Sequence, residues 1–261
     1  MLILRAMLRL TRLGNSLLAF VAIFLPMFVR TNDLKLSVGR AIPLLFICVC
    51  TFVANDVDDV EQDRVNHPDR PLPAGHLSPA VAGITYFTSL GLALFSTKYY
   101  VTQGIAFWYY GLIAISISYG YILECFPSFK APFVAAVSSI PILIVAISYP
   151  DEVKLYVVAS SVFLVSLGRE ICMDIQDRVG DRVSFMHGFN SRALAIVGFC
   201  LDAVGLLLLV GHLRKLREVI IFSLLVGLLL LAALHWFKYA KYDRASFIMK
   251  LQLAVGLYFL I

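Results

Sequence analysis

Charged side chains are scarce in this chain, and their scarcity excludes an ordinary soluble domain. Of the 261 residues, 15% are charged and 60% are hydrophobic, and the mean hydropathy is +0.86. Soluble domains average about 25% charged and 45–50% apolar residues. A chain this apolar is typical of an all-α protein that crosses the bilayer many times.

The cysteines lack the spacing of a metal or redox motif. All five lie in or beside apolar segments, and none forms a C-x-x-C pair, so we read them as free buried thiols. The N-terminus lacks the small-residue cleavage site of a signal peptide, although Arg5, Arg9 and Arg12 precede an apolar run. We therefore expect a first membrane helix with a cytosolic start. With no low-complexity segment and no linker, residues 1–261 are expected to form one transmembrane domain.

Acidic residues are few, and the excess of basic ones gives a net charge of +5 and a pI near 9.0. The basic residues cluster in short loops between apolar runs, which membrane topology explains better than a nucleic-acid partner. More of them fall beside the N-terminus and the acidic motifs than on the opposite side, which favours a cytosolic position for the motif loops.

The long apolar runs predict about nine membrane helices. Their expected ranges are 15–31, 41–60, 79–97, 105–124, 132–150, 154–175, 193–211, 218–236 and 245–261.

One acidic pattern occurs twice, at the ends of the second and sixth expected helices. Its spacing is D-x-x-D-x-x-x-D, which places three carboxylates within about 60° on one face of a helix. Asn55 can join the first set, whereas Asp58 is expected on the far side of the helix. The two sets are Asp56, Asp59 and Asp63, and Asp174, Asp177 and Asp181.

The repeat predicts two four-helix halves plus a ninth helix. An even number of helices separates the motifs, so both acidic ends emerge on the same side of the membrane. Carboxylates next to hydrocarbon usually mark function, and facing acidic clusters bind hard cations such as Mg²⁺. The anion that needs several Mg²⁺ ions is a diphosphate. Each motif is followed by a polar connection, residues 64–79 and 178–192, long enough to cover a cavity.

These stretches resemble the signatures of the UbiA-type intramembrane prenyltransferases. The first signature is similar to Asn55–Asp63 followed by Asn66-His67-Pro68-Asp69-Arg70-Pro71-Leu72-Pro73-Ala74-Gly75, and the second to Arg169–Asp181. Arg12-Leu13-Gly14-Asn15 is similar to the Arg-x-x-Asn opening of the family.

The resemblance implies a helical bundle around a central lipid-accessible cavity, closed by cytosolic cap loops. It also implies two Mg²⁺ ions that hold a prenyl diphosphate, with Asn55, Asp59, Asp174 and Asp181 as metal ligands. Asp56, Asp63 and Asp177 are expected to be further ligands or to support the ligands during catalysis. The expected substrate-binding residues are Asn15, Arg64, Arg70, Lys130, Arg178 and Arg182.

Some of these residue types have a second explanation. An arginine beside a carboxylate can hold phosphate oxygens bidentately, but topology or a surface ion pair accounts for it equally well. Tyr119 and Tyr121 are candidates to stabilise an allylic cation, whereas tyrosines near helix ends also form interfacial belts.

The leading hypothesis is a membrane-embedded transferase that ionises a prenyl diphosphate and attaches the chain to an unidentified acceptor. A terpene cyclase on the same scaffold would use the same carboxylates, so the motifs do not separate the two activities. An ion-coupled carrier is disfavoured because the carboxylates lie at helix ends rather than at the bilayer midplane.

Overall fold

The computed structural model describes residues 2–125, 129–177, 190–213, 215–238 and 242–256. Helices dominate these described residues, as the sequence predicts. The chain divides into two compact units. One comprises Met1–Pro127 with Val179–Val183, and the other comprises Ser128–Arg178 with Ser184–Ile261.

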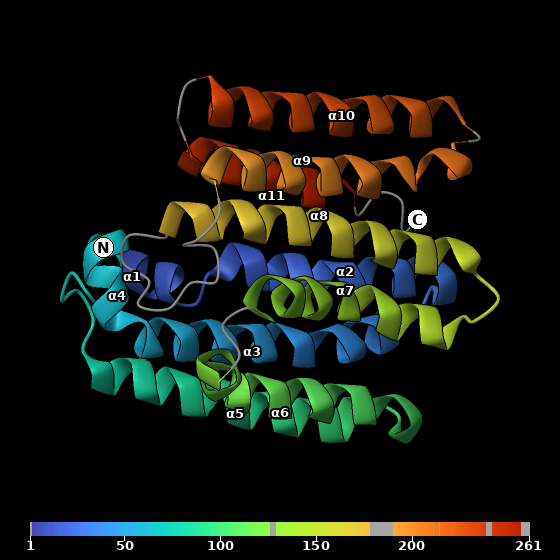
Figure 1. Ribbon diagram of the computed structural model, residues 1–261. Helices are drawn as coiled ribbons and strands as arrows, with labels where there is room; N and C mark the ends of the chain where they lie inside the picture. The colour runs from blue at the N-terminus through green and yellow to red at the C-terminus, as the bar shows by residue number, and fades with distance from the viewer. Residues whose placement is uncertain (1, 126–128, 178–189, 214, 239–241, 257–261) are drawn as a thin grey trace. The chain divides into compact units, whose positions relative to one another are not determined.

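The first unit is built around one long central helix, α3, which packs against α2, α5 and α6 (Figure 1). Two short helices, α1 and α4, lie near the end of α3 that carries the first motif. The helices are α1 (Leu2–Leu10), α2 (Leu13–Thr31), α3 (Leu34–Asp58), α4 (Val60–Asn66), α5 (Pro79–Tyr100) and α6 (Gln103–Cys125).

The second unit is likewise centred on a helix that carries a motif at its C-terminal end, α8, which packs against α7, α9 and α11. Helix α10 packs against α9 and α11. The elements are α7 (Lys130–Ser148), α8 (Val153–Asp177), α9 (Ser191–Leu207), the 3₁₀-helix η3 (Val210–His212), α10 (Leu216–Phe237) and α11 (Tyr242–Gly256).

Polar caps define where several helices begin. Asp33 accepts a hydrogen bond from the backbone N–H of Leu36 at 2.9 Å, so α3 begins at Leu34, earlier than the predicted residue 41. Ser78 caps α5, whose first residue is Pro79, a position where proline costs no hydrogen bond. The Asp33 cap thus extends α3 beyond its apolar run, whereas α5 begins at the predicted residue.

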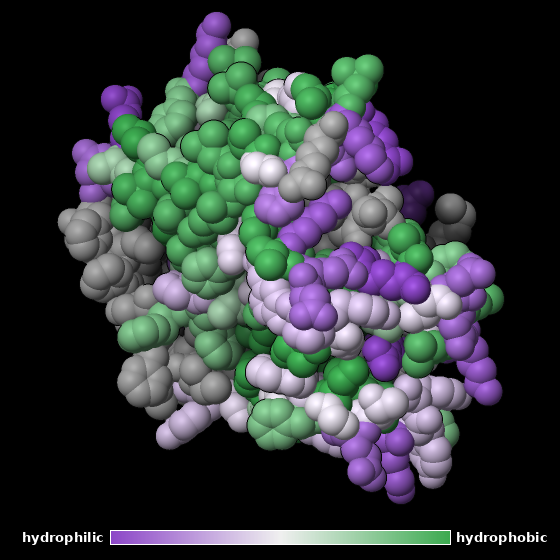
Figure 2. Space-filling view, turned by 90° about the vertical axis from the view of Figure 1, so that its right-hand side faces the viewer, coloured by the Kyte–Doolittle hydropathy of each residue, from purple (hydrophilic) through white to green (hydrophobic). Residues whose placement is uncertain are grey.

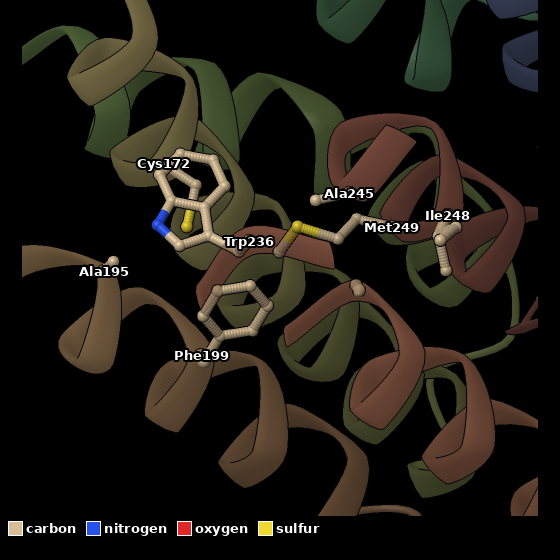
Figure 3. Close-up of a cluster of buried hydrophobic side chains, with 8 residues drawn as sticks. Cys172, Ala195, Phe199, Trp236, Ala245, Ile248 and Met249 are labelled. Atoms are coloured by element: carbon tan, nitrogen blue, oxygen red, sulfur yellow. The ribbon is translucent and has the colours of Figure 1, made fainter. Parts of the chain in front are cut away.

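Small side chains and aromatic rings form the core of the second unit. Trp236 of α10 meets Phe199 of α9 edge to face, with ring centroids 6.3 Å apart, and Cys172 of α8 and Met249 of α11 lie beside them (Figure 3). On α8 and α9, Gly168 and Gly198 let the two backbones touch. A Cβ added to Gly168 would lie 2.2 Å from the carbonyl oxygen of Gly198.

Within the described part of the chain, seven helices are long and apolar enough to cross a membrane: α2, α3, α5, α7, α8, the segment Ser191–His212, and α10. Helices α6 and α11 occupy the other two predicted ranges, so each predicted range contains a helix. Many large apolar side chains are exposed, and the face in Figure 2 shows broad hydrophobic areas beside hydrophilic ones. Such a surface suits contact with lipid.

Candidate active site

The first motif spans a break between two helices. Helix α3 ends at Asp58 and α4 begins at Val60, while Asp59 between them has φ −89° and ψ 5°. Helical hydrogen bonds continue on both sides, because the N–H of Asp59 donates to Asn55 and that of Asp63 donates to Asp59. The spacing of the motif predicts a continuous helix here, whereas the structure interrupts the helix at Asp59.

Two arginines hold Asp56 and Asp63. Nη2 of Arg12 lies 2.5 Å from Oδ1 of Asp56, and Nη1 of Arg70 lies 2.6 Å from Oδ2 of Asp63. The same Arg70 nitrogen is 3.8 Å from Asp56, so this guanidinium lies near both carboxylates. Asp56 and Asp63 are each only 4% exposed. Because a buried carboxylate is costly without a partner, these arginines make the arrangement possible.

Asn55 and Asp59 form the other pair. The side-chain amide of Asn55 donates to Oδ2 of Asp59 at 2.7 Å, and both residues are partly exposed. Asp58 is exposed and lies against α6, where its Oδ2 is 2.3 Å from the position that a Cβ on Gly120 would occupy. The predicted separation of Asp58 from the other motif carboxylates is therefore seen.

Burial also changes the acidity of the motif. Loss of water contact raises the pKa of the Asp63 carboxyl above its usual range, and the adjacent Arg70 guanidinium opposes that rise. Arg70 therefore favours the charged form of a carboxylate that burial disfavours.

The connection after α4 is a compact turn that positions Arg70. It begins at His67, because α4 continues through Asn66, and not at residue 64 as predicted. The N–H groups of His76 and Leu77 both donate to the carbonyl of Pro71, and Gly75 has φ +69°, which glycine adopts at low cost. Leu77 anchors the turn, since it is buried in a hydrophobic cluster of the first unit.

The turn is also tied to α1. Nη2 of Arg9 lies 2.6 Å from Oδ2 of Asp69, although both side chains are more than half exposed. The hydrogen bond from Arg9 lowers the pKa of the Asp69 carboxyl. Helix α1 thus contacts the segment that holds Arg70.

In the second unit, Lys130 meets the second motif. Its Nζ lies 3.1 Å from Oδ1 of Asp174, which is 7% exposed. The two residues come from the start of α7 and the end of α8, so the structure brings together two residues that the sequence proposed separately. Arg169 pairs with Glu170 one turn earlier.

The remaining predicted residues have varied positions. Arg64 is exposed and pairs with Glu61 at 2.9 Å, Asn15 lies in the first turn of α2, and Tyr121 on α6 is 73% exposed. Several others lie outside the described residues or have side chains that are not described: Tyr119, Asp177, Arg178, Asp181 and Arg182.

Arg12 contacts the first motif but is not among the site residues predicted from the sequence. The sequence assigns Arg12 to the basic N-terminus and to the family-like opening, from which Asn15 is the residue predicted to bind substrate. In the structure Arg12 adopts φ 42° between α1 and α2, and its guanidinium stacks over the Phe52 ring at 5.0 Å while it holds Asp56. The available signal was an arginine immediately before the first membrane helix.

The oxygen-rich composition of the first motif fits a hard cation. Among the described residues, no three His, Cys, Asp or Glu side chains are grouped as a complete metal site. Mg²⁺ does not require such a group, because it is usually held by one or two carboxylates together with substrate phosphates and water. Asn55 and Asp59 can supply oxygen ligands of this kind, with the arginine-bound carboxylates beside them.

Comparisons with known proteins find a family model and several relatives that match this chain. The family model described as "UbiA prenyltransferase family" matches residues 15–255. The digeranylgeranylglyceryl phosphate synthase of Thermococcus kodakarensis is 29% identical over 184 residues, which is 68% of this chain and 65% of that protein.

Solved structures share the fold. A UbiA homologue from Aeropyrum pernix K1 superposes with a TM-score of 0.75 at 14% identity, covering 94% of this chain and 96% of the other. A UbiA homologue from Archaeoglobus fulgidus bound to DMAPP and Mg²⁺ superposes with a TM-score of 0.59 at 16% identity, covering 97% and 98%.

Proposed function

Because the chain belongs to the UbiA prenyltransferase family, we propose that it transfers a prenyl chain from a prenyl diphosphate to a glyceryl phosphate lipid, with Mg²⁺ as cofactor. The Thermococcus relative is named for a product that carries two geranylgeranyl groups on glyceryl phosphate. Such a product forms when a prenyl chain joins a glyceryl phosphate that already carries one. The related Archaeoglobus structure, which holds DMAPP and Mg²⁺, supports the donor and the metal.

The main observation behind the proposal is that the side chains of the first motif have different partners. Asp56 and Asp63 contact arginines, whereas Asp59 accepts a hydrogen bond from Asn55 and remains partly exposed. Asn55 and Asp59 keep exposed surface that a cation can reach, whereas Asp56 and Asp63 are each 4% exposed and contact guanidinium groups. We therefore assign the metal to Asn55 and Asp59, and assign Asp56 and Asp63 to the positioning of Arg12 and Arg70.

In the second motif we assign metal binding to Asp174 and Asp181, with Asp177 as a supporting carboxylate. Lys130 contacts Asp174 at 3.1 Å and can contribute a positive charge to a bound diphosphate. The number of ions we propose is two, one for each motif. Arg64, Arg178, Arg182 and Asn15 remain our candidates for contacts to the substrate.

The reaction needs charge compensation more than proton transfer at the donor. The allylic C–O bond breaks, the electron pair leaves with the diphosphate, and a glycerol hydroxyl oxygen forms the new ether bond as its proton passes to the released diphosphate or to water. Mg²⁺, when bound, neutralises the charge that develops on the leaving group. Arg70 lies where a fixed positive charge can strengthen this effect, and Tyr119 and Tyr121 are our candidates for contacts to the allylic cation.

The loops that follow both motifs are assigned to the cytosolic side of the membrane. The bias of basic residues towards this side supports the assignment.

Product analysis tests the proposal. Purified protein in lipid nanodiscs is incubated with Mg²⁺ and prenyl diphosphates of several lengths, with and without geranylgeranylglyceryl phosphate. We expect an ether-linked product only when the acceptor is present. A cyclised hydrocarbon or alcohol without acceptor would show a terpene cyclase instead, and unchanged diphosphate in every mixture would contradict the acceptor assignment.

A further inference from the structure

Helix α1 packs against the motif end of the first unit through one narrow face. Ala6 is 4% exposed and Leu10 is fully buried, and both belong to a cluster with Val53, Leu77 and Ala82. Val53 lies one turn before the first motif, and Ala82 lies in the first turn of α5. Both neighbours are at the ends of candidate membrane spans, so α1 lies at the level where a bilayer meets water.

A second face of α1 is apolar but not covered by the unit. Leu4 is 64% exposed and Leu8 is 45% exposed, and Ile3 near the terminus is 68% exposed. Leu4 and Leu8 are four residues apart, so they project from the same side of the helix. Exposed leucines on a short helix at this level are suited to the boundary between headgroups and acyl chains.

A third face is basic. Arg5 and Arg9 are exposed, and they lie about 100° around the helix from Leu4 and Leu8. Helix α1 has no acidic residue. Arg9 pairs with Asp69, which lies in the compact turn after α4, whereas Arg5 lies four residues earlier on the same face of the helix. The uncovered surface of α1 therefore combines an apolar edge with a positive edge.

From this juxtaposition we infer that α1 is an interfacial helix that binds the surface of a bilayer containing anionic lipids. Leu4 and Leu8 enter the outer acyl region, while Arg5 contacts negatively charged headgroups and Arg9 remains paired with Asp69. A second copy of the same chain is a poorer partner for this face, because two positive edges would meet. Binding of α1 to the bilayer also holds the compact turn after α4 in place, since Arg9 connects α1 to Asp69. This inference goes beyond the proposed reaction and does not depend on it.

Fluorescence quenching in proteoliposomes tests the inference. Leu4→Trp places a reporter on the apolar edge, and the unsubstituted protein gives the background of Trp108 and Trp236. The vesicles contain equal amounts of phosphatidylcholine and phosphatidylglycerol, with brominated acyl chains on one lipid or on the other. We expect brominated phosphatidylglycerol to quench the reporter about twofold more than brominated phosphatidylcholine, because each basic residue near a surface favours anionic lipid.

Two charge variants in the Leu4→Trp background complete the test. Arg5→Gln should bring the ratio of quenching close to one, whereas Lys35→Gln should leave it unchanged, because Lys35 is exposed at the opposite end of α3. Matching gel-filtration profiles verify folding, and Leu8→Trp provides a second reporter. A reporter that neither lipid quenches would place α1 off the bilayer. Equal quenching by both lipids would also overturn the inference. So would an equal fall in the quenching ratio in the Arg5→Gln and Lys35→Gln variants.

Discussion

Arg70 is the residue whose role is most distinctive in the first motif. It lies 2.6 Å from Asp63 and 3.8 Å from Asp56, on a turn fixed by Gly75. A diphosphate gains charge as the allylic bond breaks, so a positive group beside it stabilises the transition state more than the ground state. Loss of this group should therefore lower kcat rather than only raise KM.

We expect Arg70→Ala to reduce kcat by about tenfold or more, equivalent to about 1.4 kcal/mol. Lysine at this position should restore only part of the activity, because its point charge cannot bridge two oxygens. Steady-state kinetics with prenyl diphosphate provides the measurement, and Lys35→Ala is the control. If Arg70→Ala raises KM and leaves kcat unchanged, Arg70 binds the ground state and the transition state equally, which would contradict this role.

The Arg9–Asp69 ion pair predicts that the stability of the fold depends on pH. The pKa of Asp69 is lower in the folded protein than in the unfolded chain, so the pair stabilises the fold above about pH 4 and loses this effect as the pH falls through the folded-state value. Exposure limits the contribution to a few tenths of a kcal/mol.

Thermal unfolding of the detergent-solubilised protein should therefore show Arg9→Ala slightly less stable than the unsubstituted protein at pH 7 and at pH 5. The difference should shrink as the pH falls below the unfolded-state value of about 4 and Asp69 becomes protonated. A difference that grows on acidification would have the wrong sign for this pair.

At the scale of elements, the contact of α8 with α9 depends on the absence of side chains. The backbone oxygens of Gly168 and Gly198 occupy the space that a Cβ would need on the opposite helix. Rigid backbone cannot move aside as a flexible side chain can, so a methyl group here forces the helices apart.

We predict that Gly168→Ala lowers the unfolding temperature of the protein in detergent by several degrees, a loss of about 1–3 kcal/mol. Gly227→Ala in α10 is the matched control, because nothing lies within 4 Å of its Cβ position. That substitution should be neutral or slightly stabilising, since alanine favours a helix. Equal destabilisation by both variants would mean that close packing is not the cause.

The helices also show which features of the structure can be predicted from the sequence. Each apolar run of about 20 residues contains a helix, and seven of these helices in the described part of the chain are long and apolar enough to cross a bilayer. The start of α3 and the break at Asp59 depend on one cap and on local backbone geometry, which hydropathy does not record. Helical spacing correctly separates Asp58 from its neighbours, but it cannot show that Arg12 and Arg70 approach Asp56, because those contacts join distant segments.

At the scale of the whole molecule, both motif loops are expected on the cytosolic side of the membrane. Single cysteines introduced at His76 and His187 should react with a membrane-impermeant reagent added from that side. A cysteine at Lys35 should react only from the other side, because α3 separates it from the first motif. Labelling of His76 and His187 from opposite sides would contradict the even number of spans between the motifs.

Asp59 is proposed to support Mg²⁺-dependent cleavage of a prenyl diphosphate through its position at the metal, and not through negative charge alone. Asp58 is its natural control, because it is adjacent in sequence but lies against Gly120 of α6.

The decisive measurement is the Mg²⁺-dependent rate of diphosphate release by Asp59→Ala and Asp58→Ala, each verified as folded by gel filtration. We predict that Asp59→Ala loses about 100-fold or more of the rate, whereas Asp58→Ala stays within about threefold of the unsubstituted protein. Normal Mg²⁺-dependent release by folded Asp59→Ala, or an equal loss in Asp58→Ala, would contradict the account.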